Sequence, residues 1–449
     1  MKVLLVSTNT MREPYPTYPI GLDYVLNAIS PPHRVRCVDM NELKTASALA
    51  DVLSGFRPDV VGVSIRNIDN VDGVCTQTFI GEVAGLIEVI RSNSEGVIVL
   101  GGSGFTILPG ELMTELDADF GVIGEGERLP LLLDALERGE SGAGLPGIVA
   151  GKGPAGYPEP ISVPFGRGIF PHHSYTSYYL KRGGMLNLQT KRGCPFGCIY
   201  CTYPHIEGRR FRFTPPSEVG QMARMLQDGG AKYLYITDST FNGSYEHSRE
   251  VARAFQKAGV SIPWGGFFTP TRPPPDYYRV LADAGLRHVE FGTEALSDLV
   301  LGLYHKSFVK EEVFLAHRSA LDAGLHVAHY LMFGGPGEDE DTIRETLSNS
   351  CQLEKTVFFV YNGVRIYPHT ALHERAVREG QLDPAANLLY PVFYWSPALS
   401  RARGTALINE LVAGRPNWVV GGGQPGMFKA LSRLHARGQV GPLWEHLVR

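Results

Sequence analysis

The first 140 residues alternate short apolar runs with amphipathic stretches. The apolar runs are rich in Val, Ile and Leu and have the length of buried strands, whereas the stretches between them show helical periodicity, as in residues 77–91. Repeated βα units with short connections predict an open parallel sheet covered by helices on both faces. We therefore expect an α/β fold that starts with a Rossmann-like, doubly wound domain over residues 1–140. Its predicted strands are residues 3–6, 35–40, 60–65, 97–100 and 120–123.

A second βα array begins near residue 184. Residues 141–183 are rich in Gly and Pro, a composition typical of a linker that wraps the surface. Six units rather than eight predict a partial (β/α)6 barrel over residues 184–381, with its active site at the C-terminal ends of the strands. The alternation is lost afterwards, so residues 382–449 are predicted to form a small C-terminal cap. The predicted barrel strands are residues 186–189, 233–237, 264–268, 288–292, 327–333 and 358–366.

Composition narrows the possible partners and the compartment. The formal net charge of −4 gives no reason to expect a nucleic-acid partner. No apolar run approaches the roughly 18 residues of a membrane span, and the short N-terminal apolar stretch is not a signal peptide. Three of the six cysteines fall within eight positions and the others are scattered, which indicates a metal site in a reducing cytoplasm rather than a disulfide framework.

The three closely spaced cysteines form the strongest chemical signal in the chain. Cys194, Cys198 and Cys201 are separated by three and two residues, and Gly193 and Gly197 permit the turns that bring their sulfurs together. Three thiolates from one loop can ligate three corners of a [4Fe–4S] cubane and leave the fourth iron open to an exogenous chelator. The spacing therefore predicts an iron–sulfur cluster with one free coordination position.

A zinc site is the alternative. Structural zinc takes four ligands, and His205 completes a Cys3His set with the three cysteines. The position of the loop argues against zinc, because the loop follows a strand and opens a βα array. Basic residues around the loop fit either a solvated rim or a rim that helps to admit anionic groups. These residues are Lys191, Arg192, Arg209, Arg210 and Arg212.

The segment CPFGCIYC, residues 194–201, resembles the CxxxCxxC signature of the radical S-adenosylmethionine (SAM) superfamily, including the aromatic Tyr200 before the third cysteine. The resemblance implies that SAM chelates the open iron through its amino and carboxylate groups. Reduction of the cluster by an external electron donor, such as flavodoxin or ferredoxin, then cleaves SAM to methionine and a 5′-deoxyadenosyl radical. The barrel supplies orientation and a water-free cavity for this chemistry.

Polar segments at the ends of consecutive predicted strands strengthen the resemblance. Residues 236–239 follow the second strand, where the family binds the SAM amine, but they lack the common Gly-Gly-Glu form. Residues 290–294 close the fourth strand, and residues 333–338 resemble the GxPGE turn that borders the adenine. A lone carboxylate at a strand end is also a common helix N-cap, so the order of the segments carries the inference. The implied SAM contacts are Tyr200, Thr237, Asp238, Glu294 and Lys306.

A doubly wound domain before such a barrel resembles the cobalamin-binding group of radical SAM enzymes, over residues 1 to about 380. Ligands of these sheets bind outside the carboxyl ends of the strands. Residues 99–106 resemble the glycine-rich stretch that accepts the nucleotide tail of cobalamin, and the alternative is an ordinary glycine-rich turn. The candidate cobalamin contacts are Ser64, Arg66, Gly101, Gly102, Ser103, Gly104, Phe105, Thr106, Gly124 and Glu125.

The domain lacks the DxHxxG motif through which methionine-synthase-like domains offer a histidine to cobalt. Its first histidine, His33, lies in a loop before the second predicted strand. We therefore expect the bound cobalamin to have no protein histidine ligand. Arg66 is a candidate to lie beneath the corrin and block ligation, and the alternative is a surface or salt-bridged arginine.

Together these features predict a cobalamin-dependent radical SAM methyltransferase that acts on an unactivated carbon, or less often on phosphorus, of a small molecule. The resemblance implies two SAM molecules per product, one as methyl donor and one as radical source. A radical cyclase, ring-contracting enzyme or oxidase of the same architecture is the first alternative. A non-catalytic cobalamin- or cluster-binding electron carrier is the second, although a carrier needs no nucleotide pocket. The acidic net charge and the lack of a recognisable RNA-binding barrel after residue 382 disfavour a tRNA-modifying enzyme.

Overall fold

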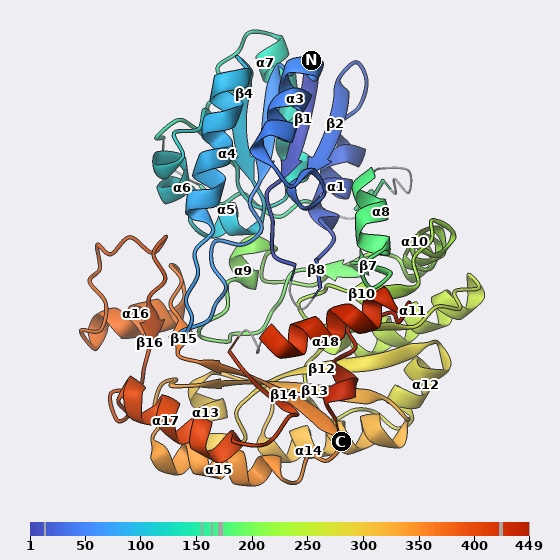
Figure 1. The fold of residues 1–449 in the computed structure, drawn as a ribbon, viewed down its shortest axis with the longest axis vertical. Coiled ribbons are helices and arrows are strands. Elements are labelled where there is room, and N and C mark those ends of the chain that lie inside the picture. Colours follow the sequence, from blue (N-terminus) through green and yellow to red (C-terminus); the bar gives the residue numbers. More distant parts are fainter. Residues whose placement is uncertain (13–14, 154–155, 163–164, 169–173, 422–424, 449) are drawn as a thin grey trace.

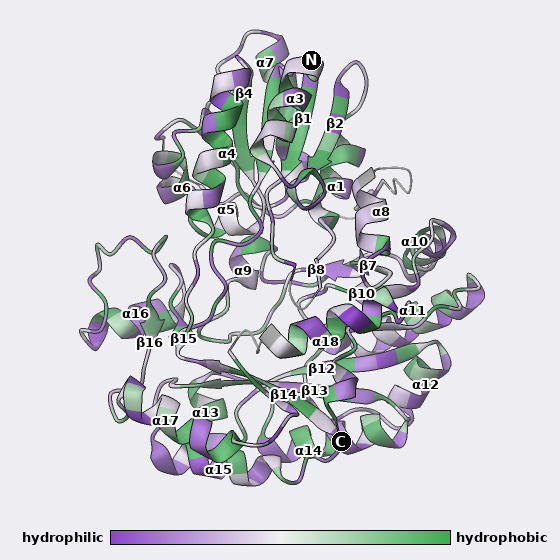
Figure 2. Cartoon of the chain, viewed as in Figure 1, coloured by the Kyte–Doolittle hydropathy of each residue, from purple (hydrophilic) through white to green (hydrophobic). Residues whose placement is uncertain are grey.

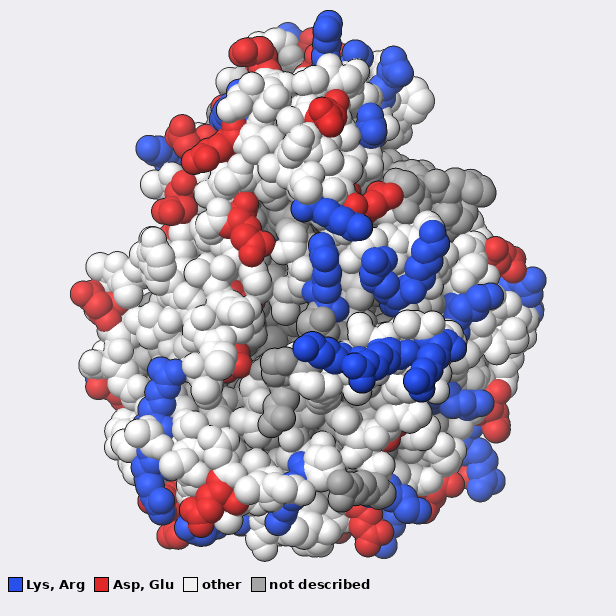
Figure 3. All heavy atoms as spheres, viewed as in Figure 1, with Lys and Arg blue, Asp and Glu red and all other residues white. Residues whose placement is uncertain are grey.

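The computed structural model describes all residues of the chain except 13–14, 154–155, 163–164, 169–173, 422–424 and 449. Figure 1 shows two sheets, one above the other, with the N-terminal α/β domain in blue over the barrel in green to red. Within the described residues, every helix falls short of the length and apolarity that crossing a membrane requires. The face in Figure 3 mixes acidic and basic side chains, except that Lys and Arg gather along α18 (Pro425–Ala436) and in the area between this helix and the N-terminal domain.

Six strands build the upper sheet, in the order β2-β1-β3-β4-β5-β6. The first five are parallel and confirm the five predicted strands, whereas β6 pairs antiparallel with β5. The strand order reverses between β1 and β3, which is where such sheets form their ligand crevice. The strands are β1 (Lys2–Ser7), β2 (Arg34–Asp39), β3 (Val60–Ser64), β4 (Val97–Gly101), β5 (Phe120–Val122) and β6 (Ile148–Ala150).

Successive residues of β1 pack against opposite layers of helices. Val3 and Leu5 belong to the core under α1 and α7, whereas Leu4 and Val6 belong to the core under α3 and α4. Because both faces are covered, the strands are almost continuously apolar, as Figure 2 shows for β1 and β4. The helices of this domain are α1 (Ile20–Ala28), α2 (Met40–Leu43), α3 (Ala46–Phe56), α4 (Ile80–Asn93), α5 (Ser103–Ile107), α6 (Pro109–Glu115), η1 (Gly126–Arg128), α7 (Leu129–Glu137) and α8 (Ser174–Leu180).

The lower sheet is a partial barrel of seven parallel strands, in the order β7-β10-β11-β12-β13-β14-β17. The first six confirm the predicted strands. The seventh lies in the segment predicted to be a cap. The strands are β7 (Met185–Leu188), β10 (Tyr233–Ile236), β11 (Trp264–Phe268), β12 (Leu286–Glu294), β13 (His326–Phe333), β14 (Thr356–Asn362) and β17 (Trp418–Val420).

Helices cover the outer face of this barrel. Most of the remaining short elements follow the carboxyl ends of its strands, whereas Met427 of α18 and Trp444 of η3 pack against Ala328 and Val357 near the starts of β13 and β14 (Figure 1). The covering helices are α10 (Pro216–Asp228), α11 (Tyr245–Lys257), α12 (Tyr277–Asp283), α13 (Asp298–Leu303), α14 (Lys310–Asp322), α15 (Glu340–Ser350) and α17 (Arg401–Val412). The other elements are β8 (Lys191–Arg192), α9 (Tyr203–Ile206), β9 (Arg212–Phe213), η2 (Phe241–Gly243), β15 (Val364–Arg365), α16 (Ala371–Arg378), β16 (Phe393–Tyr394), α18 (Pro425–Ala436) and η3 (Trp444–Leu447).

The predicted linker and cap contribute more to the two domains than the sequence indicated. β6 and β17 have three residues each, too few for a strand period to be visible in the sequence. Within the predicted linker, Arg167 is buried and forms an ion pair of 2.8 Å with Asp23 of α1. The linker therefore does not run only over the surface.

The carboxyl ends of the two sheets face each other across the domain boundary. Ser64 and Gly101 end β3 and β4 of the upper sheet, and Thr237 follows β10 of the lower one. All three line one cavity between the domains. A buried ion pair of 2.9 Å between Asp69 and Arg365 joins the loop after β3 to β15 and so ties the domains together beside this cavity.

Candidate functional site

The cysteine loop connects β8 to α9 at the carboxyl end of the barrel strands. Backbone hydrogen bonds fix it at its start and middle: the Cys194 N–H donates to the Gly208 carbonyl (3.0 Å) and the Ile199 N–H donates to the Tyr304 carbonyl (3.2 Å). Within the loop, the Cys201 N–H donates to the Cys198 carbonyl (3.2 Å). The loop is therefore held in one conformation by elements on both of its sides.

The three thiols lie close enough together to influence one another. Burial raises the pKa of Cys194, Cys198 and Cys201, to about 12 at Cys201, and the nearby cysteines raise it further at Cys198 and Cys201. A cationic iron–sulfur core reverses this effect, because metal ligation deprotonates thiols outright. The donor set fits a cluster.

The geometry disfavours the zinc alternative. Thiolates on one tetrahedral zinc ion lie roughly 4 Å apart. In the part of the chain that the structure describes, the three sulfurs do not come together within 4.8 Å, whereas a wider cubane accepts such a spacing. Nε2 of His205 lies 2.8 Å from the carbonyl oxygen of His369, so this imidazole is already engaged.

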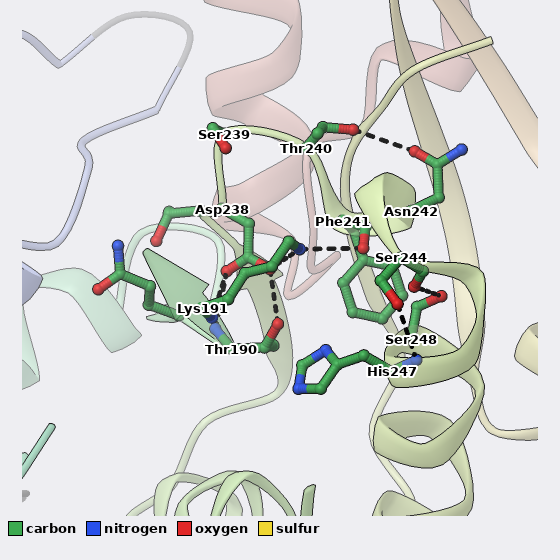
Figure 4. A network of polar contacts seen from close by, with 12 residues as sticks. Thr190, Lys191, Asp238, Ser239, Thr240, Phe241, Asn242, Ser244, His247 and Ser248 are labelled. Atoms are coloured by element: carbon green, nitrogen blue, oxygen red, sulfur yellow. Dashed lines mark hydrogen bonds and ion pairs between the residues drawn. The ribbon is translucent and has the colours of Figure 1, made fainter. Parts of the chain in front are cut away.

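A buried polar network lies below the loop (Figure 4). Nζ of Lys191 lies 2.7 Å from Oδ2 of Asp238 and also donates to the Phe241 carbonyl (3.0 Å). The Asp238 carboxylate accepts three further hydrogen bonds, from the Thr190 N–H (2.7 Å), the Thr190 hydroxyl (2.6 Å) and the Lys191 N–H (3.4 Å). Both carboxylate oxygens of Asp238 are therefore occupied, and the geometry favours a structural role for Asp238 over the implied contact with SAM.

Three of the implied SAM contacts come together beside the cysteines. Nζ of Lys306 lies 2.5 Å from Oε2 of Glu294 and 3.3 Å from the Tyr200 hydroxyl. The Tyr200 ring meets Tyr304 edge-on, at 84° and 5.6 Å between centroids. Glu294 has φ of 60°, a left-handed conformation that is costly for this residue and is typically retained at functional sites. Thr237 lies apart from this group and lines the cavity between the domains.

The GGPGE turn after β13 owes its shape to Glu338. Its buried carboxylate accepts from the N–H groups of Gly334 and Gly335, and burial raises its pKa to about 8. A Cβ at Gly335 would lie 2.0 Å from the Tyr304 hydroxyl. The turn therefore packs directly on the tyrosine that anchors the cysteine loop.

The cavity between the domains offers about 370 Å³ of space for solvent. Its upper wall comes from the carboxyl ends of β1, β3 and β4, and its lower wall includes α9, which follows the cysteines. Most of the candidate cobalamin contacts line it. They are Ser64, Arg66, Gly101, Gly102, Ser103, Gly124 and Glu125.

The remaining three candidates, Gly104, Phe105 and Thr106, do not line the cavity but pack behind the residues that do. Phe105 and Thr106 are fully buried, and the Thr106 hydroxyl accepts from the Gly124 N–H (2.8 Å) and donates to the Gly102 carbonyl (3.0 Å). A Cβ at Gly104 would lie 2.9 Å from the Arg66 carbonyl oxygen, so this glycine lets α5 pack on the end of β3. The burial of Phe105 and Thr106 and the close packing at Gly104 favour a supporting role over direct contact with a ligand, a distinction that the sequence alone does not make.

Arg66 projects into the cavity. Its side chain is accessible although protein surrounds it, and this enclosure lowers the pKa of its guanidinium. Among the described residues, no hydrogen bond or ion pair engages that guanidinium, so the salt-bridged alternative is wrong. His33 lies elsewhere, with Nδ1 3.2 Å from the N-terminal amine and Nε2 3.3 Å from Asp134. Within the described part of the chain, no histidine lines the cavity.

The basic cluster around the cysteines does not form a solvated rim. Arg192 binds Glu125 (2.8 Å) and Glu127 (2.6 Å), and Arg212 also binds Glu125 (2.8 Å). Lys191 is buried on Asp238, and only Arg209 and Arg210 of the cluster are exposed. Sequence showed the charges but not their partners, because Glu125 is 67 positions from Arg192 in the chain.

Comparison with known protein families follows the same two-part division. Residues 10–133 match the B12 binding domain family, and residues 188–349 match the radical SAM superfamily. The N-terminal domain is thus a B12-binding domain, and the barrel is a radical SAM domain.

Several related proteins are methyltransferases. An uncharacterized methyltransferase of Pyrococcus horikoshii is 25% identical over 81% of this chain and 79% of its own length. The tryptophan 2-C-methyltransferase of Streptomyces laurentii is 24% identical over 72% of this chain and 65% of its own, so the alignment spans less than two thirds of that protein. The cytidylyl-2-hydroxyethylphosphonate methyltransferase of Streptomyces wedmorensis is 24% identical over 86% of this chain and 84% of its own length.

Solved structures share the whole fold. The radical SAM methyltransferase TsrM of Kitasatospora setae, with cobalamin and a [4Fe–4S] cluster bound, superposes with a TM-score of 0.85 at 23% identity. The superposition covers 99% of this chain and 97% of that one. The cobalamin-dependent SAM radical enzyme OxsB, with aqua-cobalamin and SAM bound, superposes with a TM-score of 0.74 at 15% identity. The superposition covers 98% of this chain and 71% of OxsB. At these identities the likeness establishes the fold.

Proposed function

We infer that this chain, which belongs to the radical SAM enzymes that carry a B12-binding domain, is a cobalamin-dependent radical SAM methyltransferase that acts on a small molecule. The observation that carries this inference is the shared cavity. Arg66 and Gly101 line it from the B12-binding domain, and Tyr203, two residues after Cys201, lines it from the barrel. A methyl carrier bound to one domain and a SAM-binding cluster bound to the other can therefore act on the same substrate.

The proposed roles of the residues follow from their chemistry. Cys194, Cys198 and Cys201 ligate the cluster, and Lys306, held by Glu294, offers a positive charge to the SAM carboxylate. When bound, the cluster with SAM supplies reductive SAM cleavage, and cobalamin supplies a carrier for the methyl group. The protein orients these groups and keeps water from them.

The upper wall of the cavity suits a corrin ring. Added Cβ atoms at Gly101 and Gly124 would meet no atom closer than 3.8 Å, so both glycines leave the backbone open to a bulky ligand. Arg66 supplies an unpaired cation where other cobalamin domains present histidine. We propose that Arg66 lies against the lower corrin face and keeps the cobalt free of a protein ligand there.

The proposed target is an unactivated carbon. The relatives include a tryptophan 2-C-methyltransferase and a hopanoid C-3 methylase, both named for methylation at carbon. A cyclase also occurs among the relatives, but it aligns with only 34% of this chain and 26% of its own length. Methyl transfer is therefore favoured over cyclisation.

We also propose a reducing compartment, the cytoplasm, and an external electron donor of the flavodoxin or ferredoxin type. All six cysteines are free thiols in the structure, which suits such a compartment. Cleavage of SAM needs an electron, and the family chemistry takes it from outside the enzyme.

The test needs no knowledge of the substrate. The protein is reconstituted anaerobically with iron, sulfide and cobalamin, and then given reductant and SAM with a deuterated methyl group. We expect S-adenosylhomocysteine to accumulate, and we expect the cobalamin recovered from the protein to carry deuterium by mass spectrometry. Cell extracts from a producing strain are then screened for a small molecule that takes up the label.

Three outcomes separate the candidate functions. Deuterium in a product with 5′-deoxyadenosine supports the radical methyltransferase. 5′-Deoxyadenosine without deuterium in cobalamin or product refutes methyl transfer and assigns a cyclase, oxidase or ring-contracting enzyme. Deuterium transfer without any 5′-deoxyadenosine refutes the radical step and leaves a polar methyltransferase with the same fold.

A further inference from the structure

Strand β12 carries an extra residue where it ends. Up to Gly292 its residues pair one to one with those of β13. The next pair is Glu294 with Leu331, so Thr293 and Glu294 together oppose a single residue of β13. Such a β-bulge re-aims the side chains beside it and is common next to active sites. Here the re-aimed side chain is that of Glu294, which holds Lys306 beside the cysteine loop.

The backbone at this bulge is strained. The Ala295 N–H donates to the Thr293 carbonyl at 2.8 Å and closes a three-residue turn centred on Glu294. The positive φ of Glu294, 60°, belongs to the rare and strained form of this turn. An added Cβ at Gly292 would lie 3.2 Å from Oε1 of Glu294, so the turn folds the carboxylate back over the strand. A residue in such a conformation persists only where its surroundings hold it.

A chain of buried hydrogen bonds holds the start of the turn. The Thr293 hydroxyl lies 2.7 Å from Nδ1 of His329, and Nε2 of His329 lies 3.0 Å from Nδ1 of His317 on α14. Nε2 of His317 lies 3.0 Å from the Glu354 carbonyl oxygen. Thr293, His329 and His317 are all buried, and we call them the Thr–His–His relay.

The carbonyl at the far end fixes the direction of every bond in the relay. A carbonyl only accepts, so Nε2 of His317 carries a proton and Nδ1 of His317 accepts from His329. Nδ1 of His329 in turn accepts from the Thr293 hydroxyl. Burial lowers the pKa of both imidazoles, to about 4 at His317, so both are neutral at pH 7, as this arrangement requires. Removal of the Thr293 hydroxyl would therefore leave a buried acceptor on His329 without its donor.

Helix α15 holds the end of the turn. Nδ2 of Asn349 donates to the Leu296 carbonyl at 2.8 Å, and the Leu296 N–H donates to the Thr346 hydroxyl at 3.2 Å. The strained turn thus lies between two anchors, one on each side of Glu294. Both anchors bind neighbours of Glu294 in the chain and act on its carboxylate through the backbone.

We propose that the Thr–His–His relay and Asn349 are positioning groups, which hold Glu294 in its strained conformation and so place Lys306 for the carboxylate of SAM. The inference rests on the proposed function, in which Lys306 offers its charge to SAM. Without the relay the turn relaxes, and the conformation that binds SAM becomes a minor population. The apparent affinity for SAM then falls in proportion to that population.

Removal of one hydroxyl tests this step. Thr293→Val keeps the shape of the side chain and leaves Nδ1 of His329 without a donor. Anaerobic calorimetry on the holoprotein, without reductant and therefore without turnover, measures the dissociation constant of SAM. We expect this constant to rise about 5-fold to 100-fold, the equivalent of the strain that one such residue stores. Thr293→Ser returns the hydroxyl and should restore most of the affinity.

Thr356→Val is the matched control. Thr356 is a buried threonine at the amino end of β14 in the same barrel, and its hydroxyl donates to the Val327 carbonyl at 2.9 Å. This change should lower the free energy of unfolding, as Thr293→Val does, and leave the dissociation constant of SAM unchanged. Asn349→Ala keeps the test decisive if Thr293→Val fails to fold, because it loosens the other anchor from a half-buried position and should also weaken SAM binding.

Combination with Glu294→Gln shows whether the relay acts through Glu294. In that background Lys306 has already lost its anionic partner, so adding Thr293→Val should cost no further affinity for SAM. A merely structural role of Thr293 would instead multiply the two losses.

Three results would overturn the proposal. Equal SAM affinity in Thr293→Val and Thr356→Val would show that the relay does not position the site. Failure of Thr293→Ser to restore binding would exclude the hydroxyl as the group that matters, and multiplied losses in the double variant would exclude Glu294 as the group it acts on. Since SAM binding is measured without methyl transfer, failure of the deuterium experiment and failure of this one are distinguishable.

Discussion

Removal of the Lys191 ammonium tests whether the network below the cysteine loop carries the stability of the barrel. Lys191 and Asp238 have side chains that are 1% and 0% exposed, with 2.7 Å between their charged atoms. Lys191→Met keeps the length of the side chain and leaves the Asp238 carboxylate buried without its cation. Breaking a buried ion pair in this way costs about 3–5 kcal/mol.

The two hydrogen bonds from Thr190 stay in place in this variant, so the loss comes from the uncompensated charge. The double variant Lys191→Met/Asp238→Asn removes both charges and keeps an oxygen that accepts from Thr190. We therefore expect its loss to be smaller than that of Lys191→Met by roughly 1–3 kcal/mol, the range of coupling between residues in contact. A double variant that is more stable than one of its parents is a signature of a buried pair.

Tryptophan fluorescence is a suitable readout, because all four tryptophans, at positions 264, 395, 418 and 444, lie in the barrel domain or its C-terminal extension. Urea unfolding followed in this way reports on the barrel and not on the B12-binding domain. Iron content of the reconstituted protein gives a second readout. We expect Lys191→Met to lower it, since β8 leads directly into the cysteine loop.

The matched control is Arg224→Met, which removes the cation of an exposed ion pair on α10 of the same domain. Arg224 and Asp228 are 46% and 56% exposed, so this change should cost no more than about 0.5 kcal/mol. If Lys191→Met shifts the unfolding midpoint no further than Arg224→Met, the buried pair does not carry stability and the reasoning is refuted. Equal losses for the single and double variants would refute the charge explanation.

Four further outcomes are expected. Gly193→Ala should lower the iron content, because its φ is 87° and an added Cβ would lie 2.1 Å from the Arg210 carbonyl oxygen, whereas Gly197→Ala has open space and should retain the iron. Replacement of Cys194, Cys198 and Cys201 together by Ala should abolish the brown [4Fe–4S] absorbance, whereas replacement of Cys37, Cys75 and Cys351 by Ala should preserve it. An intact cluster in the first variant would rule out this ligand set. Burial lowers the pKa of His317 to about 4, below that of the unfolded chain, so the contribution of His317 to the stability of the barrel should fall by about 3 kcal/mol as the pH falls from about 6.5 to about 4. The buried Glu338, with a pKa raised to about 8, acts in the opposite direction over part of this range, so the test is the difference in urea unfolding between the protein and His317→Gln, and parallel pH profiles for the two would contradict this. Paramagnetic resonance of protein-bound cob(II)alamin should show no splitting from an imidazole nitrogen, and such splitting would contradict the place given to Arg66.

The strands could be predicted from the sequence, and so could the single loop that carries the three cysteines. Strands covered on both faces are continuous apolar runs, and a ligand loop keeps its donors at fixed spacing, so both signals are local. β6 and β17 were missed because three residues leave no period to detect.

Asp238 shows why site residues are harder to assign than strands. A carboxylate directly after a barrel strand has the same local sequence whether it binds a ligand or a lysine of the chain. Its partner Lys191 is 47 positions away, and only the fold brings the two together. The same limit applies to Phe105 and Thr106, whose glycine-rich surroundings fit a cofactor wall although their side chains face the core.

The charges buried between the domains give the cavity its shape. Glu125 receives Arg192 and Arg212 from the barrel, and Arg365 of the barrel binds Asp69, which is 296 positions away in the chain. Desolvation of such groups makes a buried pair a weak source of net stability, but each pair strongly penalises any arrangement of the domains that separates its charges. Such contacts between the two domains therefore favour one separation between the cysteine loop and the glycine-rich edge formed by residues 101–104. That separation decides whether a methyl carrier on one wall can reach a substrate held by the other, so we infer that these ion pairs serve the reaction chiefly by fixing the distance between the two cofactor sites.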